Sequence, residues 1–425
     1  MRTAFTTPEF LETLSLCLPA DFLFPNLEIL HWNPASDASI FHHVRWFLTS
    51  RIRDLSITCN SLSELLSSLA SRCPSLAHVR VSTDLLALIV ISATYNCCPA
   101  LSTFVLALPQ IESLHIPTLD DTALAHLAQM PDLKTLHIPY GQPGYTSQPY
   151  MGTPGFPNLA ELTVMTMRCA LRVISMAAKC PLVKLSITPS SLYPTETMAR
   201  DFYHTLSEHC SHFSLREISM SGEFGVEEDN NNTLSADEAA EYSVGGDVLL
   251  PLFSFFNLVE VRLAHPVGFD FDDATILDMA RAWPHLEALE LTARPHRHIR
   301  SHVTLKGVYA FAKHCPHLHT LGLTFDATVV PSLRDHGAKR VAQTRLEFLN
   351  VAASLIAKSK ICRVAKFLSA IFPHLMFIMT LNDDIIAGSL DEEDEPSQSV
   401  VDSSELWLDV QSALSTSPLL RNSSK

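Results

Sequence analysis

One pattern of hydrophobic and polar positions recurs along the chain. It starts with Pro or another loop residue and continues as Leu-x-x-Leu-x-Leu, in which Ile, Val or Phe can replace Leu. About fourteen copies occur, mostly spaced by roughly 20–29 residues, which is the signature of a structural repeat. The good copies start at Pro25, Pro74, Pro131, Pro157, Pro284 and Pro316, and weaker copies lie at Ile52, Leu101, Ile111, Leu182, Leu215, Leu258, Leu346 and Leu375.

The last two apolar positions of each copy predict a short strand with one buried face. Side chains alternate between the two faces of a strand. In one copy, Leu136 and Ile138 therefore face the core. Thr135 and His137 face the opposite, open side. Strands of successive copies are expected to pair in parallel, and the return segments must cover the apolar face.

The segments between the copies predict helices. Apolar residues recur at helical spacing in residues 122–128 and 304–314, each just before the Pro of the next copy. Residues 61–71, 171–178 and 274–282 show the same spacing. A strand and a helix in each repeat predict an α/β leucine-rich-repeat solenoid, a horseshoe with parallel strands on the concave face and helices on the convex face. We expect it to span residues 1–381.

Three stretches break the period. Residues 140–156 are dense in Pro, Gly and Tyr and predict a loop excursion, which is either a binding rim with Tyr145 and Tyr150 as candidate contacts or tolerated surface variation. Residues 222–247 are too polar to pack and are expected to be a second excursion. Residues 382–425 form an acidic, Ser-rich tail that we expect to be mostly disordered, although its short apolar patch at 406–408 is open to docking.

Composition narrows the class of partner. With 47% hydrophobic residues the chain can build a continuous core, but no apolar run is long enough to span a bilayer. The formal net charge of -15 argues against a general affinity for nucleic acids or anionic membranes. The start of the chain lacks the features of a secretory signal, so we expect an intracellular, cytoplasmic or nuclear protein.

The cysteines and histidines do not indicate a metal or redox centre. None of the 10 cysteines forms a CxxC pair, and four precede Pro at one phase of the repeat, as small buried residues would. A loop with His296, His298 and His302 is rich in arginine, and the positive charge of Arg297 and Arg300 opposes a cation there. We expect no metal and treat these two arginines as candidate rim contacts for an acidic partner.

Nothing in the chain indicates catalysis. A nucleotide-binding loop, a nucleophile elbow and an HExxH motif are all missing from the sequence. We therefore expect a protein that is not an enzyme and that needs no cofactor.

The open strand face is the predicted binding surface. In each copy one residue lies between the last two core positions and points outward. His115 and His137 fall in neighbouring strands, and two interpretations are open: protonation near pH 6 makes the pair repel and tunes binding, or they are two ordinary surface histidines. The column reads His31, Ser56, Arg80, Val105, His115, His137, Thr163, Ser186, Ser219, Arg262, Glu290, Gly322 and Asn350, of which His31, Arg80, His115, His137, Thr163, Arg262, Glu290 and Asn350 are the candidate contacts.

The C-terminal repeats resemble a known family. Residues 346–351, 354–356 and 364–375 look like the terminal repeat and cap of the F-box/leucine-rich-repeat proteins abundant in fungi. Leu355 stands where the family pattern usually has Pro. The resemblance implies the substrate-recognition part of a Skp-cullin-F-box ubiquitin-ligase adaptor, which docks on a Skp-type subunit through an F-box and captures a client protein through its repeats.

No F-box is visible in this sequence, because the first good repeat begins by Phe24 and the residues before it look like the end of another repeat. We therefore expect either a shortened F-box protein or a repeat-only relative. A free-standing binding module without a link to ubiquitin is the main alternative, and a GTPase regulator, which would need an exposed Arg or Asn on a strand-end loop, is a further one. The sequence does not identify the client.

Overall fold

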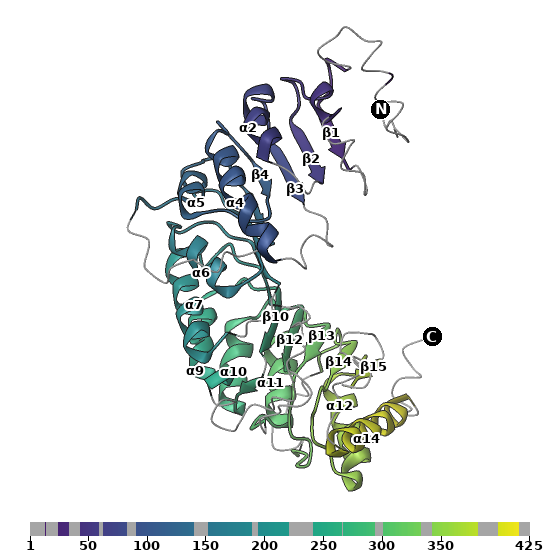
Figure 1. Cartoon of the computed structure of the whole chain (residues 1–425). Coiled ribbons are helices and arrows are strands. Elements are labelled where there is room, and N and C mark those ends of the chain that lie inside the picture. Colours follow the sequence, from purple (N-terminus) through teal and green to yellow (C-terminus); the bar gives the residue numbers. More distant parts are fainter. Residues whose placement is uncertain are drawn as a thin grey trace. The chain divides into compact units, whose positions relative to one another are not determined.

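The structure is a computed structural model of the whole chain. It describes residues 13, 24–33, 43–58, 63–82, 91–139, 152–188, 194–220, 241–265, 267–293, 301–332, 342–380 and 398–415. The chain divides into two compact units, Met1–Leu182 and Val183–Lys425, called unit 1 and unit 2 below (Figure 1). The division falls inside the region that the sequence predicts as one solenoid.

Unit 1 contains a parallel sheet whose strands follow one another in chain order. Each strand belongs to one copy of the repeat, and its apolar residues are buried at every second position, as in Leu55 and Ile57. The predicted strands of this unit are therefore confirmed, except the one at Leu101. They are β1 (Ile29–Trp32), β2 (Asp54–Thr58), β3 (His78–Ser82), β4 (Ser113–His115), β5 (Thr135–Ile138) and β6 (Glu161–Val164).

Helices return the chain between these strands. They are α2 (Ser63–Arg72), α4 (Ile91–Leu106), α5 (Asp121–Ala128) and α6 (Met167–Ser175) (Figure 1). Three of them begin and end within a few residues of predicted helices. The exception is α4, because the sequence predicted a strand at Leu101.

The predicted strand at Leu101 is wrong, and so is the place of Val105 in the outward column. Both residues lie in α4. Leu101, Phe104, Val105 and Leu108 are all buried and follow the i, i+3, i+4, i+7 spacing of one helix face. The first two apolar positions of the Leu-x-x-Leu-x-Leu pattern are three residues apart, as on one face of a helix. In an apolar stretch the pattern therefore fits a helix as well as a strand.

Unit 2 repeats the same architecture. Its parallel strands pair in chain order, apart from a separate short pair formed by β9 (Val244–Gly245) and β11 (Phe269–Asp270). All seven copies predicted in this unit are strands of its main sheet in the described residues. They are β7 (Lys184–Ile187), β8 (Glu217–Met220), β10 (Glu260–His265), β12 (Ala288–Ala293), β13 (Thr320–Gly322), β14 (Phe348–Asn350) and β15 (Phe377–Met379).

The helices of unit 2 include those predicted at 274–282 and 304–314. The second polar excursion is partly wrong, because residues 241–247 contribute to β9 and to a short helix whose Val248 is fully buried. The helical segments are α7 (Glu196–His209), α9 (Gly246–Leu249), η2 (Leu250–Ser254), α10 (Asp273–Ala282), α11 (Leu305–His314), η3 (Lys358–Lys360), α12 (Ile361–Ile371) and α14 (Gln398–Ser415).

The tail is not disordered throughout, since α14 lies within it and packs against α12. Trp407, Val410 and Leu414 are buried at helical spacing. The Trp407 indole Nε1 donates to the Ser354 carbonyl oxygen at 2.9 Å, and its ring meets Phe325 edge-on at 5.6 Å. Docking of the apolar patch at 406–408 is confirmed, and the prediction of disorder is wrong for residues 398–415.

The cysteines of the repeat are core residues where the structure describes their side chains. Cys73, Cys180 and Cys315 are buried. Burial raises the pKa of Cys73 to about 11 and that of Cys315 to about 12. The thiols of Cys73 and Cys315 therefore stay protonated and unreactive at neutral pH. Within the described residues, no helix combines the length and apolar character needed to cross a membrane.

Candidate functional site

The open face of unit 1 carries the predicted outward column. Strand register places one outward residue of each strand directly beside the next. These side chains are exposed or half-buried, whereas the residues on either side of each are buried. The placement predicted from the sequence is thus confirmed, while a role in binding stays a prediction. The row reads His31, Ser56, Arg80, His115, His137 and Thr163.

His115 and His137 lie against each other in this row. Their ring centroids are 3.9 Å apart, with an angle of 37° between the ring planes. Burial, His137 and Arg80 together lower the pKa of His115 to about 4. Burial and Arg80 also lower the pKa of His137. The prediction that the pair protonates near pH 6 is therefore wrong for His115, and the pKa of His137 also lies below its usual value.

Arg80 places a guanidinium in this row, which is positively charged at neutral pH. Ser56 lies beside it on β2 and His115 on β4. The acidic residues of the adjoining strands stand one outward position earlier, with Asp54 opposite His78 and Glu161 opposite Thr135. The row itself therefore combines a guanidinium with three imidazoles, those of His31, His115 and His137, and no carboxylate.

The open face of unit 2 holds the remaining predicted residues. Strand register aligns Ser186, Ser219, Arg262, Glu290, Gly322, Asn350 and Met379 in one row.

The cations of this face are paired with neighbouring carboxylates. Arg262 lies 2.9 Å from Glu260 and 3.5 Å from Glu290. Lys184 lies 2.6 Å from Glu217. The charge of this face is therefore largely neutralised within the unit.

The row of unit 2 is recessed at Gly322, which has no side chain, beside Asn350. A side chain at Gly322 would begin 3.3 Å from Glu290 Cγ, so its absence leaves room between Glu290 and Asn350. The Asn350 Oδ1 accepts the backbone N–H of Ala352 at 2.9 Å, and Ala352 has a positive φ of 46°. Asn350 therefore also shapes the turn that follows β14.

An apolar end of the unit 2 face was not predicted. Phe348 and Phe377 stack at 5.3 Å with an angle of 12° between their planes. Phe377 is 47% exposed, Met376 54% and Met379 36%. The signal was present in the sequence, because Phe348 and Phe377 occupy the outward position two residues before Asn350 and Met379.

A cleft of about 540 Å³ also escaped prediction. It lies where the strands of unit 1 begin. A carboxylate of its lining, Glu112, has a lowered pKa because Lys134 donates a hydrogen bond to it at 2.8 Å. It had no sequence signal, since its residues come from turns of successive repeats. The lining residues are Glu28, Ser50, Arg51, Arg53, Ser75, Ala77, Gln110, Ile111, Glu112 and Asp132.

The four predicted rim residues, Tyr145, Tyr150, Arg297 and Arg300, lie outside the described residues. No cluster of His, Cys, Asp or Glu able to hold a metal occurs in the part of the chain that the structure describes. His302, from the histidine-rich loop, lies 3.5 Å from Asp270.

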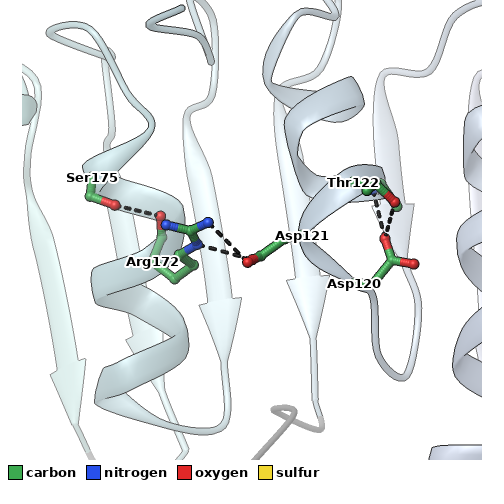
Figure 2. A network of polar contacts seen from close by, with 6 residues as sticks. Asp120, Asp121, Thr122, Arg172 and Ser175 are labelled. Carbon is green, nitrogen blue, oxygen red and sulfur yellow. Dashed lines mark hydrogen bonds and ion pairs between the residues drawn. The ribbon is translucent and has the colours of Figure 1, made fainter. Parts of the chain in front are cut away.

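A polar network on the helical side of unit 1 is structural. The Arg172 guanidinium binds the Asp121 carboxylate through two bonds of 2.9 Å and so links α5 to α6 (Figure 2). Asp120 accepts the backbone N–H of Ala123 at 2.8 Å and caps the start of α5. The network thus holds the helices of adjacent repeats together.

No protein-family model matches the chain, and no curated protein matches it. Among solved structures, the chain is similar to a chain of the crystal structure of the Rad7 and Elc1 complex in yeast. The identity is 14% and the TM-score 0.34, over 84% of this chain and 82% of that chain. A likeness at this level carries no argument about the function of this chain.

Proposed function

We propose that the chain is a non-catalytic protein-interaction scaffold, related to the substrate-recognition part of Skp-cullin-F-box ligase adaptors. The observation that supports this proposal is the row of outward side chains on the open face of each unit. In unit 1 the row runs in register from His31 to Thr163 and in unit 2 from Ser186 to Met379.

The shape of these faces suits a macromolecule better than a small molecule. Strands of a parallel sheet lie about 4.8 Å apart, so a row across several strands offers a wide, shallow surface. Small-molecule sites are instead concave and mostly apolar. The proposed horseshoe curvature would present the rows as concave binding surfaces, as in other repeat proteins. The resemblance of residues 346–375 to a family cap supports the ligase-related part of the proposal.

Capture of partners from an extract by the full chain tests the scaffold function. We expect Arg80→Glu and Arg262→Glu to reduce recovery of the captured partners severalfold, because each reverses a charge on an open face. Arg168→Glu on α6 and Lys306→Glu on α11 are matched controls, since both residues are exposed on helices. Equal loss in controls and test variants would contradict binding through the open faces.

The ligase relationship needs a separate measurement. A Skp-type subunit should co-purify with the full-length product of the native gene in stoichiometric amount. Partner capture through the open faces without any Skp-type subunit would remove the ligase role and leave a free-standing binding module. A panel of small GTPases should turn over at their intrinsic rates in the presence of the chain; acceleration would instead support a regulator.

A further inference from the structure

Three groups that can carry positive charge adjoin one another on unit 1. Arg80 on β3 is in register with His115 on β4, and His115 is in register with His137 on β5. Strand spacing of about 4.8 Å places the three residues within about 10 Å of one another along the row. The 3.9 Å contact between the two rings shows that the imidazoles share one place on the face.

The charge of Arg80 is available to a ligand. Within the described residues, no carboxylate lies within ion-pair distance of Arg80, whereas Arg262 on the corresponding row of unit 2 has two. The Arg80 side chain is exposed. A guanidinium offers up to five N–H donors in a planar fork that matches the oxygens of carboxylate and phosphate.

We propose that Arg80, His115 and His137 form a recognition site for an oxyanion carried by an acidic segment of a client protein. The inference rests on the proposed scaffold function and names the chemistry of its partner. Arg80 supplies a bidentate contact, and the adjoining imidazoles supply one N–H each or, when protonated, two. Ser56 and Thr163 extend the row with hydroxyl groups on the outer strands.

Binding at this site is coupled to proton uptake. In the free protein, burial, His137 and Arg80 oppose the protonation of His115. An oxyanion offsets the repulsion from Arg80 and favours imidazolium, so affinity rises as pH falls. The row also contains His31 on β1, and the titratable groups one outward position earlier are His78 on β3, Asp54 on β2 and Glu161 on β6.

The test measures binding of labelled peptides to the full chain at low salt. The probes are hexaglutamate, a hexapeptide with two phosphoserines and hexaglutamine as the neutral control. We expect both acidic probes to bind at least about tenfold more tightly than hexaglutamine, and their ratio distinguishes carboxylate from phosphate as the preferred group. Arg80→Gln should weaken acidic probes about tenfold, whereas Arg168→Gln should leave them unchanged.

The role of the two histidines is measured separately, through the pH dependence of probe binding. Between about pH 7.5 and about pH 5.5, acidic-probe affinity should rise severalfold in the native chain and stay flat in the double variant His115→Gln/His137→Gln. NMR of labelled histidine should show the pKa of both rings rising when a probe binds. Circular dichroism and thermal unfolding confirm that each variant is folded.

Three results would overturn the inference. They are equal binding of acidic and neutral probes, unchanged binding by Arg80→Gln, and tighter binding of an RNA oligomer than of either acidic peptide. If the acidic probes fail but Arg80→Glu still reduces partner capture, the scaffold function stands and only the oxyanion chemistry is lost. If partner capture fails but the acidic probes still bind, the oxyanion site stands and the scaffold function is lost.

Discussion

The open faces of the two units handle exposed charge in different ways. In unit 1, Arg80 adjoins two neutral imidazoles. In unit 2, Arg262 lies between Glu260 and Glu290, and the face ends in the stacked pair Phe348 and Phe377. A cation that is already paired has less to gain from a new anion than one that is free. The same repeat thus yields one face suited to acidic groups and another whose free surface is partly apolar.

The largest effect is expected from a variant that tests whether the stability of unit 2 depends on helix α14. Trp407→Ala should lower the free energy of unfolding by about 3–5 kcal/mol, because it leaves a cavity and removes the hydrogen bond to Ser354. Chemical denaturation measures the loss, and hydrogen exchange should place it in unit 2. The exposed neighbour Leu408 is the control, and a comparable loss in Leu408→Ala would contradict the argument.

A buried histidine makes the stability of unit 2 sensitive to acid. His265 is 1% exposed, and burial lowers its pKa to about 4. The unfolded chain therefore takes up this proton first, and stability is lost as pH falls from about 6.5 to about 4, by about 3 kcal/mol in all. His265→Phe should flatten this part of the pH–stability curve. The exposed His285→Gln serves as the control, and identical curves for His265→Phe and the native chain would refute the assignment.

A smaller effect separates the helical side of unit 1 from its open face. Arg172→Ala should cost about 1 kcal/mol, because Asp121 is partly exposed and regains water when its partner is removed. Denaturant unfolding monitored in unit 1 measures the change. Probe binding at the open face should not change in this variant; a parallel loss of binding would show that the two sides are coupled.

The smallest effect concerns the electrostatics of the row itself. Arg80→Gln should raise the pKa of His115 and of His137, because Arg80 opposes the protonation of both. NMR titration of the histidine rings measures both pKa values. His265 is the internal control, since only burial lowers its pKa. An unchanged His115 would mean that burial and His137 alone hold it neutral.

The strands and the outward rows followed from the sequence because the repeat fixes which side chain faces out. His115 and His137 were paired correctly on that basis. Their protonation was not, since the pKa values depend on burial and on ring contact, which periodicity does not report. The strand expected at Leu101 failed because an isolated apolar stretch fits both periods.

Contacts between segments that are distant in the sequence were also not predicted. The apolar patch around Trp407 indicated docking, but its partners Phe325 and Ser354 lie in loops after other strands. The cleft lined by Glu28, Arg53 and Glu112 is likewise assembled from turns far apart in the chain. Such sites depend on how turns stack across repeats, and the repeat pattern specifies the strands far better than the turns.

Helix α14 also shields part of the outer edge of β15. A parallel ladder built from repeats ends in a strand whose outer backbone groups can template another chain, and exposed edges of this kind promote aggregation. The Gln411 Oε1 of α14 accepts the backbone N–H of Ile378 at 3.2 Å and so occupies a donor of β15. With α14 detached, a second molecule could continue the ladder from β15. Residues 398–415 therefore cover one backbone donor on the outer edge of β15, and removing them would leave that donor open to another strand.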